Sequence, residues 1–202
     1  YYTLSGVVPN AGDIKFVPQR DIEYKQEITD EDRTILGKDV PDFTYGVNLS
    51  LQYKGFEFSM FGQGISGTKV AFDVYGVHPF YHGQDSPRKY HLKRWTEENP
   101  NSRFPRLTFM NKSHYLQTSD LWLMNGSYLR LKTAEISYTL PQKDFLKKVG
   151  IESVRFYCNG YNLLTLFSDL NDIDIDPEGV TDGGNNNYPN IRIYNFGVNI
   201  SF

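Results

Sequence analysis

Acidic side chains gather between residues 169 and 178, and they are the closest approach to a metal-binding pattern in the sequence. The group consists of Asp169, Asn171, Asp172, Asp174, Asp176 and Glu178. Oxygen atoms of this kind ligate Ca²⁺, which takes about 6–8 of them. The EF-hand spacing, with its central Gly and distal Glu, is absent, and Pro177 restricts the segment. A calcium site formed by Asp172, Asp174, Asp176 and Glu178 is therefore one expectation, and a solvated acidic loop without metal is the other.

Aromatic residues form the second group that could do chemistry, and they lie in the stretch from about 65 to 125. The candidates are Tyr75, Tyr81, Tyr90, Trp95 and Tyr115. Flat aromatic faces can stack on sugar rings, so these residues are expected to bind a ligand or, equally, to pack the loop or an interface. The histidines of this stretch are interpreted as scattered loop residues, because Pro79 and Gly83 argue against a helical face shared by His78 and His82. The run from Trp95 to Asn99, ahead of Pro100, predicts a short helix.

No residue set predicts catalysis, so we do not expect an enzyme. The sequence has no Gly-x-Ser-x-Gly elbow, no phosphate-binding glycine loop and no His-Glu-x-x-His motif. The single Cys158 excludes an internal disulfide framework and a thiolate metal cluster. The net charge of -3, without a basic stripe, argues against a nucleic-acid partner.

Strict alternation of apolar and polar residues indicates the elements that must position these loops. From Phe43 to Tyr53 every second residue is apolar, over a length that suits the ~9–11 residues of a tilted transmembrane strand. Lys54-Gly55 predicts a tight turn into a return strand from Phe56. Further strands are expected at about 127–140, 152–166 and 190–202, and the end of another at 1–8. Glu57, Glu135 and Arg155 fall on the polar faces, where we expect them to hydrogen-bond along a barrel wall.

The alternation slips once, inside the strand expected at 127–140. Arg130 and Lys132 share parity with the apolar residues that follow, whereas Leu129 and Leu131 have the opposite parity. Either a bulge shifts the register, or this part of the strand stands above the hydrocarbon layer. We favour the second interpretation.

Connection lengths give the strands a direction. The connections are short at 54–55 and 141–150 and long at about 65–125 and 167–189. In outer-membrane barrels the periplasmic turns are short and the extracellular loops are long. This alternation favours a membrane barrel, and it places Phe202 at the periplasmic side.

The final strand carries a pattern of its own. Asn195, Gly197, Ile200 and Phe202 follow a polar-x-Gly-x-x-apolar-x-aromatic spacing that resembles the terminal signal read by the barrel-assembly machinery of Gram-negative bacteria. The chain opens at Tyr1 without a signal peptide, which an outer-membrane protein needs. Five or six strands are also fewer than the roughly eight of the smallest barrels. We therefore expect residues 1–202 to be the carboxy-terminal part of a larger antiparallel transmembrane β-barrel.

A series of motifs along the whole chain is similar to the SusC/RagA-type TonB-dependent transporters of Bacteroidetes. The series comprises Gly12-Asp13-Ile14-Lys15-Phe16, Lys54-Gly55-Phe56, Phe61-Gly62-Gln63-Gly64, the block from Leu121 to Pro141, Gly160 to Thr165, Asp176-Pro177-Glu178 and Tyr188-Pro189. Each motif is weak alone, but their order and spacing together are specific. One departure is visible: an Asn-Gly-Asp-Gly turn of the family is replaced by the run from Arg20 to Glu27, which puts a cation site there in doubt.

The resemblance implies a plugged barrel of roughly 22 strands in the cell outer membrane. It further implies a SusD-like surface lipoprotein as a lid, the TonB complex acting through a plug that lies outside these residues, and an oligosaccharide or peptide as cargo. The outer wall would contact outer-membrane lipid. The alternative from another class is a soluble secreted β-sandwich that binds carbohydrate through exposed aromatic residues.

Overall fold

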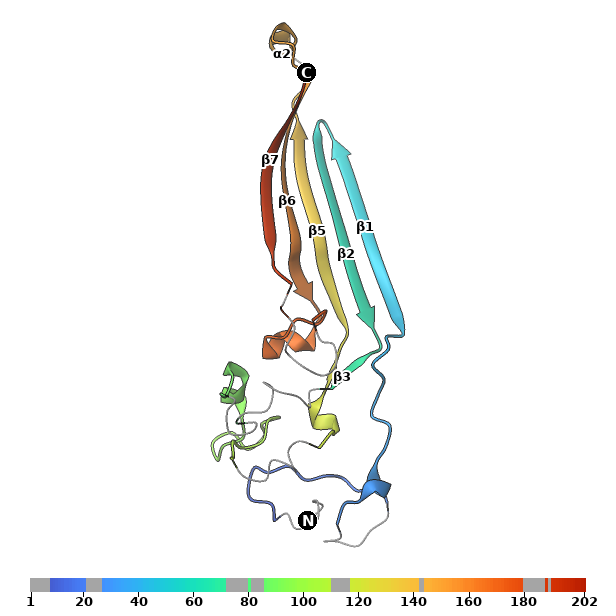
Figure 1. The fold of residues 1–202 in the computed structure, drawn as a ribbon, viewed down its shortest axis with the longest axis vertical. Coiled ribbons are helices and arrows are strands. Elements are labelled where there is room, and N and C mark those ends of the chain that lie inside the picture. The colour runs from blue at the N-terminus through green and yellow to red at the C-terminus, as the bar shows by residue number, and fades with distance from the viewer. Residues whose placement is uncertain are drawn as a thin grey trace.

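A computed structural model describes residues 8–20, 27–71, 80, 86–109, 117–141, 144–179, 188 and 190–202. Its main element is one antiparallel sheet of five long strands in the order β1-β2-β5-β6-β7 (Figure 1). The strands are β1 (Phe43–Tyr53), β2 (Phe56–Ser66), β5 (Tyr128–Thr139), β6 (Ser153–Leu166) and β7 (Ile193–Ser201). All five strands predicted between residues 43 and 202 are therefore confirmed. The strand end expected at 1–8 lies outside the described residues except for Val8.

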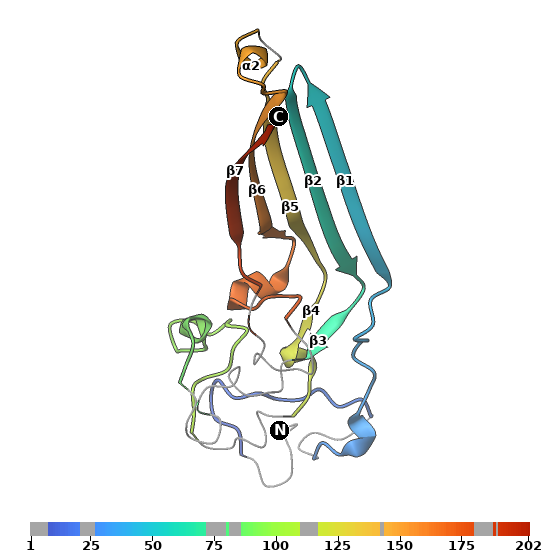
Figure 2. The same ribbon diagram turned by 45° about the horizontal axis from the view of Figure 1, so that its top comes forward.

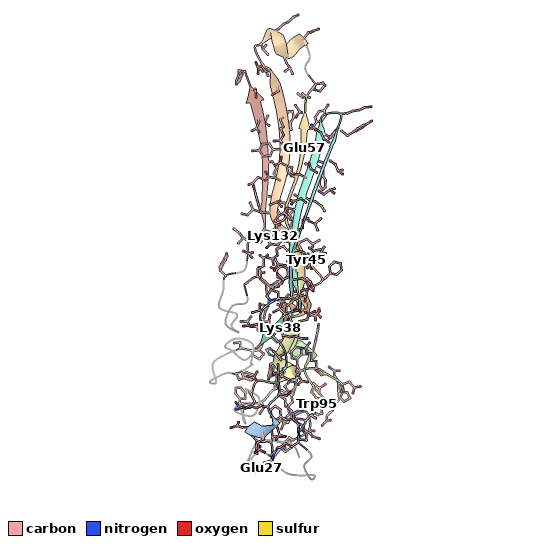
Figure 3. All side chains as sticks on the ribbon, turned by 90° about the vertical axis from the view of Figure 1, so that its right-hand side faces the viewer. Glu27, Lys38, Tyr45, Glu57, Trp95 and Lys132 are labelled. Carbon is pink, nitrogen blue, oxygen red and sulfur yellow. The ribbon has the colours of Figure 1, made fainter. Side chains whose placement is uncertain are left out.

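The sheet has one apolar face, which we call the outer face. Its residues pair with one another across the strands, for example Leu51 with Phe58 and Phe156 with Val198. Many of these side chains are bare, with Phe43 at 70% and Phe196 at 79% exposure. Within the described residues the only other sheet has two short strands, so this face carries no second layer of the kind that a β-sandwich would need. Seen along the sheet, side chains stand out on both sides of the strands (Figure 3).

The opposite, inner face is polar and joined by hydrogen bonds. Arg155 donates to Glu135 at 2.6 Å and to Glu57 at 3.3 Å, as expected for wall-lining side chains. Glu135 in turn accepts from Asn159, which accepts from Asn195 on β7. One connected row thus crosses β2, β5, β6 and β7. A face that carries such a row suits water or protein, whereas the outer face suits lipid.

A bulge at Lys132 explains the slip in the alternation of β5. Phe61 of β2 pairs with Thr133, but the next residue, Gly62, pairs with Leu131, so Lys132 has no partner on β2. On the other side β6 carries an extra residue near Asn162, whose φ is +51°. The bulge returns Leu129 and Leu131 to the outer face and turns Arg130 inward. The favoured interpretation, a strand end above the lipid, is therefore not what explains the slip, because the register itself shifts.

Both short connections lie at one end of the sheet, together with Phe202, and the long ones lie at the other (Figures 1 and 2). Lys54 and Gly55, at φ +46° and +85°, close the β1–β2 hairpin with the positive φ angles of a type I′ turn. The connection from β5 to β6 contains the short helix α2 (Asp144–Lys148). The expected alternation of short and long connections is confirmed.

The long connections form a lobe with short elements of its own. They contain β3 (Lys69–Ala71), η3 (Lys89–Lys93), η4 (Asp120–Trp122), β4 (Leu123–Asn125) and η5 (Asp169–Ile173), with β3 paired to β4, whereas η1 (Asp30–Asp32) lies in the segment before β1. The helix predicted from Trp95 to Asn99 is wrong: Thr96 and Asn99 bridge across a tight turn, and the helical residues precede it in η3. Among the described residues no helix is long and apolar enough to cross a membrane.

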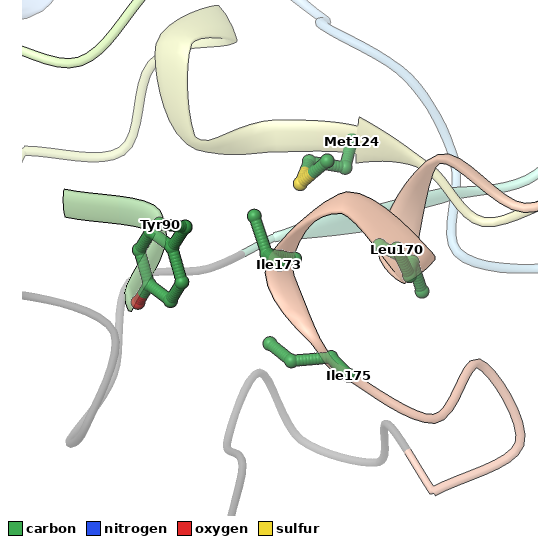
Figure 4. Close-up of a cluster of buried hydrophobic side chains, with 5 residues drawn as sticks. All are labelled: Tyr90, Met124, Leu170, Ile173 and Ile175. Atoms are coloured by element: carbon green, nitrogen blue, oxygen red, sulfur yellow. The ribbon is translucent and has the colours of Figure 1, made fainter. Parts of the chain in front are cut away.

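A small hydrophobic core holds this lobe together (Figure 4). It joins five buried side chains from three separate segments: Tyr90, Met124, Leu170, Ile173 and Ile175. Leu170 is fully buried, and Val70 and Phe104 pack around the cluster. The core fixes η3, β4 and η5 against one another, and these are the elements that form the candidate site.

Candidate functional site

A pocket of about 600 Å³ opens between the elements that meet at the lobe core. Its lining comes from η3 and the turn after it, from β4 and from η5: Lys93, Asn99, Ser102, Arg103, Phe104, Met124, Asp169, Asp172 and Ile173. The apolar residues among them belong to, or pack against, the hydrophobic core. The remaining residues are polar or charged, so the pocket combines three apolar side chains with six that can hydrogen-bond or carry charge.

The segment after η3 is folded back on itself by local hydrogen bonds. The Asn99 side-chain amide donates to the carbonyls of Lys93 and Arg94, and the Ser102 hydroxyl also donates to the carbonyl of Lys93. The backbone N–H of Trp95 donates to the carbonyl of Phe104 at 2.8 Å. These contacts place residues 99–104 beside Lys93, so that both sides of the turn face the pocket.

Charges of both signs line the pocket without neutralising one another. Lys93 and Arg103 come from the η3 side, and Asp169 and Asp172 come from η5. Among the described residues none of the four takes part in an ion pair. The guanidinium of Arg103 makes only long contacts, at 3.4–3.5 Å, with the carbonyls of β4 and η4. The pocket can therefore present a cationic side and an anionic side to one ligand.

Arg130 fixes the loop after η5 to the inner face of the sheet. Its guanidinium donates to Asp176 at 2.5 Å and to Glu178 at 2.8 Å, and its Nε donates to Thr165. Lys132 also bonds Glu178, at 2.8 Å. The Arg130 side chain is only 5% exposed. We call this group of Arg130, Lys132, Asp176 and Glu178 the wall latch.

The wall latch keeps Asp176 ionised. Burial alone would raise the pKa of Asp176, but the hydrogen bond from Arg130 and the backbone N–H groups of Glu178 and Asn190 outweigh it. The pKa of Asp176 therefore lies below its ordinary value of 3.8. Because its oxygens already accept these hydrogen bonds, the Asp176 carboxylate stabilises the loop.

The segment before β1 is tied to the same lobe. Asp13 accepts from the Arg106 guanidinium at 2.5 Å and from the backbone N–H of Asn10, and its side chain is 3% exposed. Gly12, at φ +82°, lies under the indole of Trp95, and a Cβ at this position would overlap that ring. The Gly12-Asp13 pair thus forms a turn that docks on the loop beyond η3.

The predicted aromatic binding residues fall in different places. Tyr90 is 4% exposed and packs in the lobe core against Phe104, and burial raises its pKa to about 12. Of the two roles expected from the sequence, ligand binding and loop packing, Tyr90 has the packing role. Trp95 is half-buried over Gly12 and does not line the pocket. Tyr75, Tyr81 and Tyr115 lie outside the described residues.

The four predicted metal ligands are not brought together as one set. Asp176 and Glu178 belong to the wall latch, whereas Asp172 lines the pocket and Asp174 is exposed at the end of η5. Within the described ranges no group of three or more His, Cys, Asp or Glu side chains could hold a metal ion. Calcium binding by these residues stays a prediction.

The residues of the terminal pattern lie on β7 and directly after its end. Asn195 and Gly197 are on the inner face, where Asn195 bonds Asn159 and Gly197 lies under the Tyr157 ring. Ile200 is on the outer face, and Phe202 follows the strand end at 82% exposure. Two polar-face positions and two apolar positions thus occupy the two sides of one strand. Recognition of this pattern by the assembly machinery stays a prediction.

Sequence reasoning missed the pocket residues Lys93 and Arg103 and the role of Arg130. The two pocket cations belong to a segment without periodicity, so nothing in the local pattern marks them. For Arg130 the sequence did contain a signal, which was the slip in the alternation. A bulge at that point turns the Arg130 side chain inward, where it contacts Asp176 and Glu178.

No family model matches the chain, but curated proteins and solved structures are similar to it. TonB-dependent receptor P3 of Formosa agariphila is 32% identical over 212 residues, covering 99% of this chain and 20% of that protein. TonB-dependent receptor P26 of the same organism is 33% identical over 186 residues, covering 87% and 18%. The chain thus spans about a fifth of the length of the curated relatives it matches.

Solved structures of the RagAB peptide importer are similar in fold. The open-open state has a TM-score of 0.64 at 29% identity over 87% of this chain and 19% of that one. The closed-closed state has a TM-score of 0.62 at 27% identity over 99% and 21%. With its five-stranded wall and the order of its motifs, the chain belongs to the SusC/RagA-type TonB-dependent outer-membrane transporters, of whose β-barrel it forms a segment.

Proposed function

We propose that the whole protein imports nutrients across the outer membrane as the barrel subunit of a SusC/SusD-type transporter. The observation that carries the proposal is the wall itself, with a bare apolar outer face and a hydrogen-bonded polar inner face, in a chain of this family. An open apolar sheet of this kind is suited to lipid on one side and to a water-filled or plugged lumen on the other. Import, and no catalysis, is the activity that we assign.

The orientation follows from the ends of the sheet. Short connections in outer-membrane barrels face the periplasm, so the hairpin at 54–55, α2 and Phe202 are assigned to the periplasmic rim. The lobe with its pocket and core is then extracellular. This placement supports capture of cargo from outside, in the outer membrane of a Bacteroidetes-like bacterium.

Three further partners follow from family membership. A SusD-like surface lipoprotein would close over the extracellular lobe, and the TonB complex would act through a plug that these residues do not include. The barrel-assembly machinery would read Asn195, Gly197, Ile200 and Phe202 before β7 is embedded in lipid. The solved relatives, named RagAB peptide importer, favour a peptide cargo over a glycan, and the Formosa relatives carry no cargo in their names.

The experiment is an uptake assay in the native host. Deletion of the gene, and separately of tonB, should abolish accumulation of the labelled cargo, and the intact gene should restore it. Labelled tripeptides and labelled oligosaccharides are offered in parallel, so the assay also decides the cargo class. Uptake of both classes at wild-type rates in the deletion strain would overturn the proposed function.

A further inference from the structure

We propose that the pocket between η3 and η5 is a subsite for a zwitterionic peptide, with its carboxylate toward Lys93 and Arg103 and its ammonium group toward Asp169 and Asp172. The inference rests on the proposed function and names the cargo class that this site selects. It requires a ligand that carries both charges within a volume of about 600 Å³, which is the size of a short peptide segment.

The separation of charge in the pocket is the main reason. The two cations and the two carboxylates belong to different walls, and among the described residues no ion pair consumes any of them. The other acidic residues of the same loop, Asp176 and Glu178, are already neutralised by the wall latch. Asp169 and Asp172 are therefore the carboxylates of this loop that line the pocket and remain available to a ligand there, whereas the exposed Asp174 does not line it.

The apolar side chains of the pocket offer a surface for an apolar side chain of the peptide. Phe104, Met124 and Ile173 line the pocket together with the charged residues. Met124 and Ile173 are buried parts of the lobe core, so this surface is fixed. An apolar side chain in the middle of a peptide would cover it, and its two neighbouring residues would reach the walls.

Other ligand classes fit the same walls less well. A phosphate-like dianion would satisfy the cations but would meet like charge at Asp169 and Asp172. A neutral oligosaccharide offers hydroxyl groups to both walls and neutralises neither. A metal ion would leave Lys93 and Arg103 without a partner and would be repelled by them. Only a ligand with separated opposite charges pairs all four side chains.

Each side of the pocket is held by contacts of its own. On the η5 side Leu170 is fully buried, and the wall latch anchors the residues that follow. On the other side Asn99 and Ser102 fasten the turn to the carbonyl of Lys93. Such preorganisation lowers the entropic cost of binding, because the charged side chains are carried on backbone that is already ordered.

The test measures binding of three peptides to the full-length transporter in detergent by isothermal titration calorimetry. The probes are Ala-Leu-Ala with free ends, its N-acetyl form and its C-terminal amide. Exposed ion pairs contribute about 0.2–1 kcal/mol each, so blocking either end should weaken binding by up to about fivefold. Lys93→Gln should reduce the effect of amidation and leave that of acetylation, and Asp172→Asn should do the reverse, because Arg103 and Asp169 remain as the second partners.

Matched controls separate the pocket from general charge effects. Lys89→Gln changes an exposed lysine of the same η3, and Asp174→Asn changes an exposed carboxylate at the end of η5, at a position of positive φ that Asn tolerates. Both controls should keep the full preference for free ends. Arg103 is left intact because its guanidinium contacts the carbonyls of the neighbouring elements.

The outcome that overturns the subsite is equal discrimination among the three peptides by Lys93→Gln, Asp172→Asn and their controls. Cellotriose binding that weakens in the two pocket variants while peptide binding does not would also overturn it, in favour of a sugar site. Neither result touches the proposed function, which fails only if TonB-dependent uptake itself is missing from cells.

Discussion

Replacing Arg130 by Met should release the loop after η5 from the barrel wall. The substitution keeps a long apolar stem but removes the donors to Asp176, Glu178 and Thr165. Both carboxylates would then be left partly buried, at 10% and 14% exposure. Removing one partner of a buried ion pair costs about 3–5 kcal/mol. Lys132 and backbone N–H groups still serve the carboxylates, so we expect about 3 kcal/mol.

Hydrogen exchange by mass spectrometry on the full-length transporter measures this loss directly. Local opening controls exchange in a loop of this kind, and 3 kcal/mol corresponds to exchange about 100-fold faster across residues 168–179. Segments of β5 beyond the bulge, at 133–139, should be unchanged. The matched control is Arg33→Met, which removes an exposed pair with Asp30 and should leave exchange as in the wild type.

The same segment should respond to pH with a defined sign. The pKa of Asp176 lies below 3.8 in the folded protein. Its contribution is therefore complete above that ordinary value and is lost as the pH falls through the folded pKa. Protection of residues 168–179, corrected for intrinsic exchange, should be flat near neutrality and decline below about pH 4. A change of less than about threefold in Arg130→Met, or a loss of protection on raising the pH, would refute the reasoning.

Three further substitutions test the wall and the lobe. Gly64→Ala would drive a Cβ into a backbone carbonyl and should cost about 1–3 kcal/mol, seen as a lower midpoint of heat-induced unfolding on gels, whereas Gly62→Ala, with nearest atoms at 3.6 Å, should not. Leu49→Arg, on the outer face in mid-strand, should cost about 2–4 kcal/mol and reduce folded barrel in outer-membrane fractions. Ser50→Arg on the inner face is its control, and equal loss in both would contradict the assignment of the faces. Asp13→Asn should make residues 8–20 sensitive to limited proteolysis by weakening their tie to the lobe, and unchanged cleavage would argue against that tie.

The wall could be predicted from the sequence because its physics is periodic. A strand between lipid and a polar interior must alternate at every residue, so β1 appears in the sequence with the bounds it has in the structure, Phe43–Tyr53. The other strands begin or end within three residues of the ranges expected for them. Arg155 was placed on the polar face by parity alone, and its bonds to Glu135 and Glu57 follow from that placement.

The lobe could not be predicted in the same way, because its contacts join residues far apart in the chain. Arg106 meets Asp13 across 93 residues, and Arg130 meets Asp176 across 46. Neither contact produces a repeating pattern of residue types that could be recognised in the sequence. Tyr90 illustrates the consequence: its type suits a sugar platform as well as a core, and only the position of Met124 and Leu170 around it decides for the core.

The bulge at Lys132 links the periodic wall to the lobe. Without the extra residue, Arg130 would share the outer face with Ala134 and Ile136 and would carry a charge into lipid, at a cost of about 2–4 kcal/mol near the midplane. With it, Arg130 turns inward and finds Asp176 and Glu178. That latch fixes the chain after η5, and η5 carries the carboxylates of the pocket. One unpaired residue in the wall therefore helps to determine where the loop that lines the proposed subsite is held.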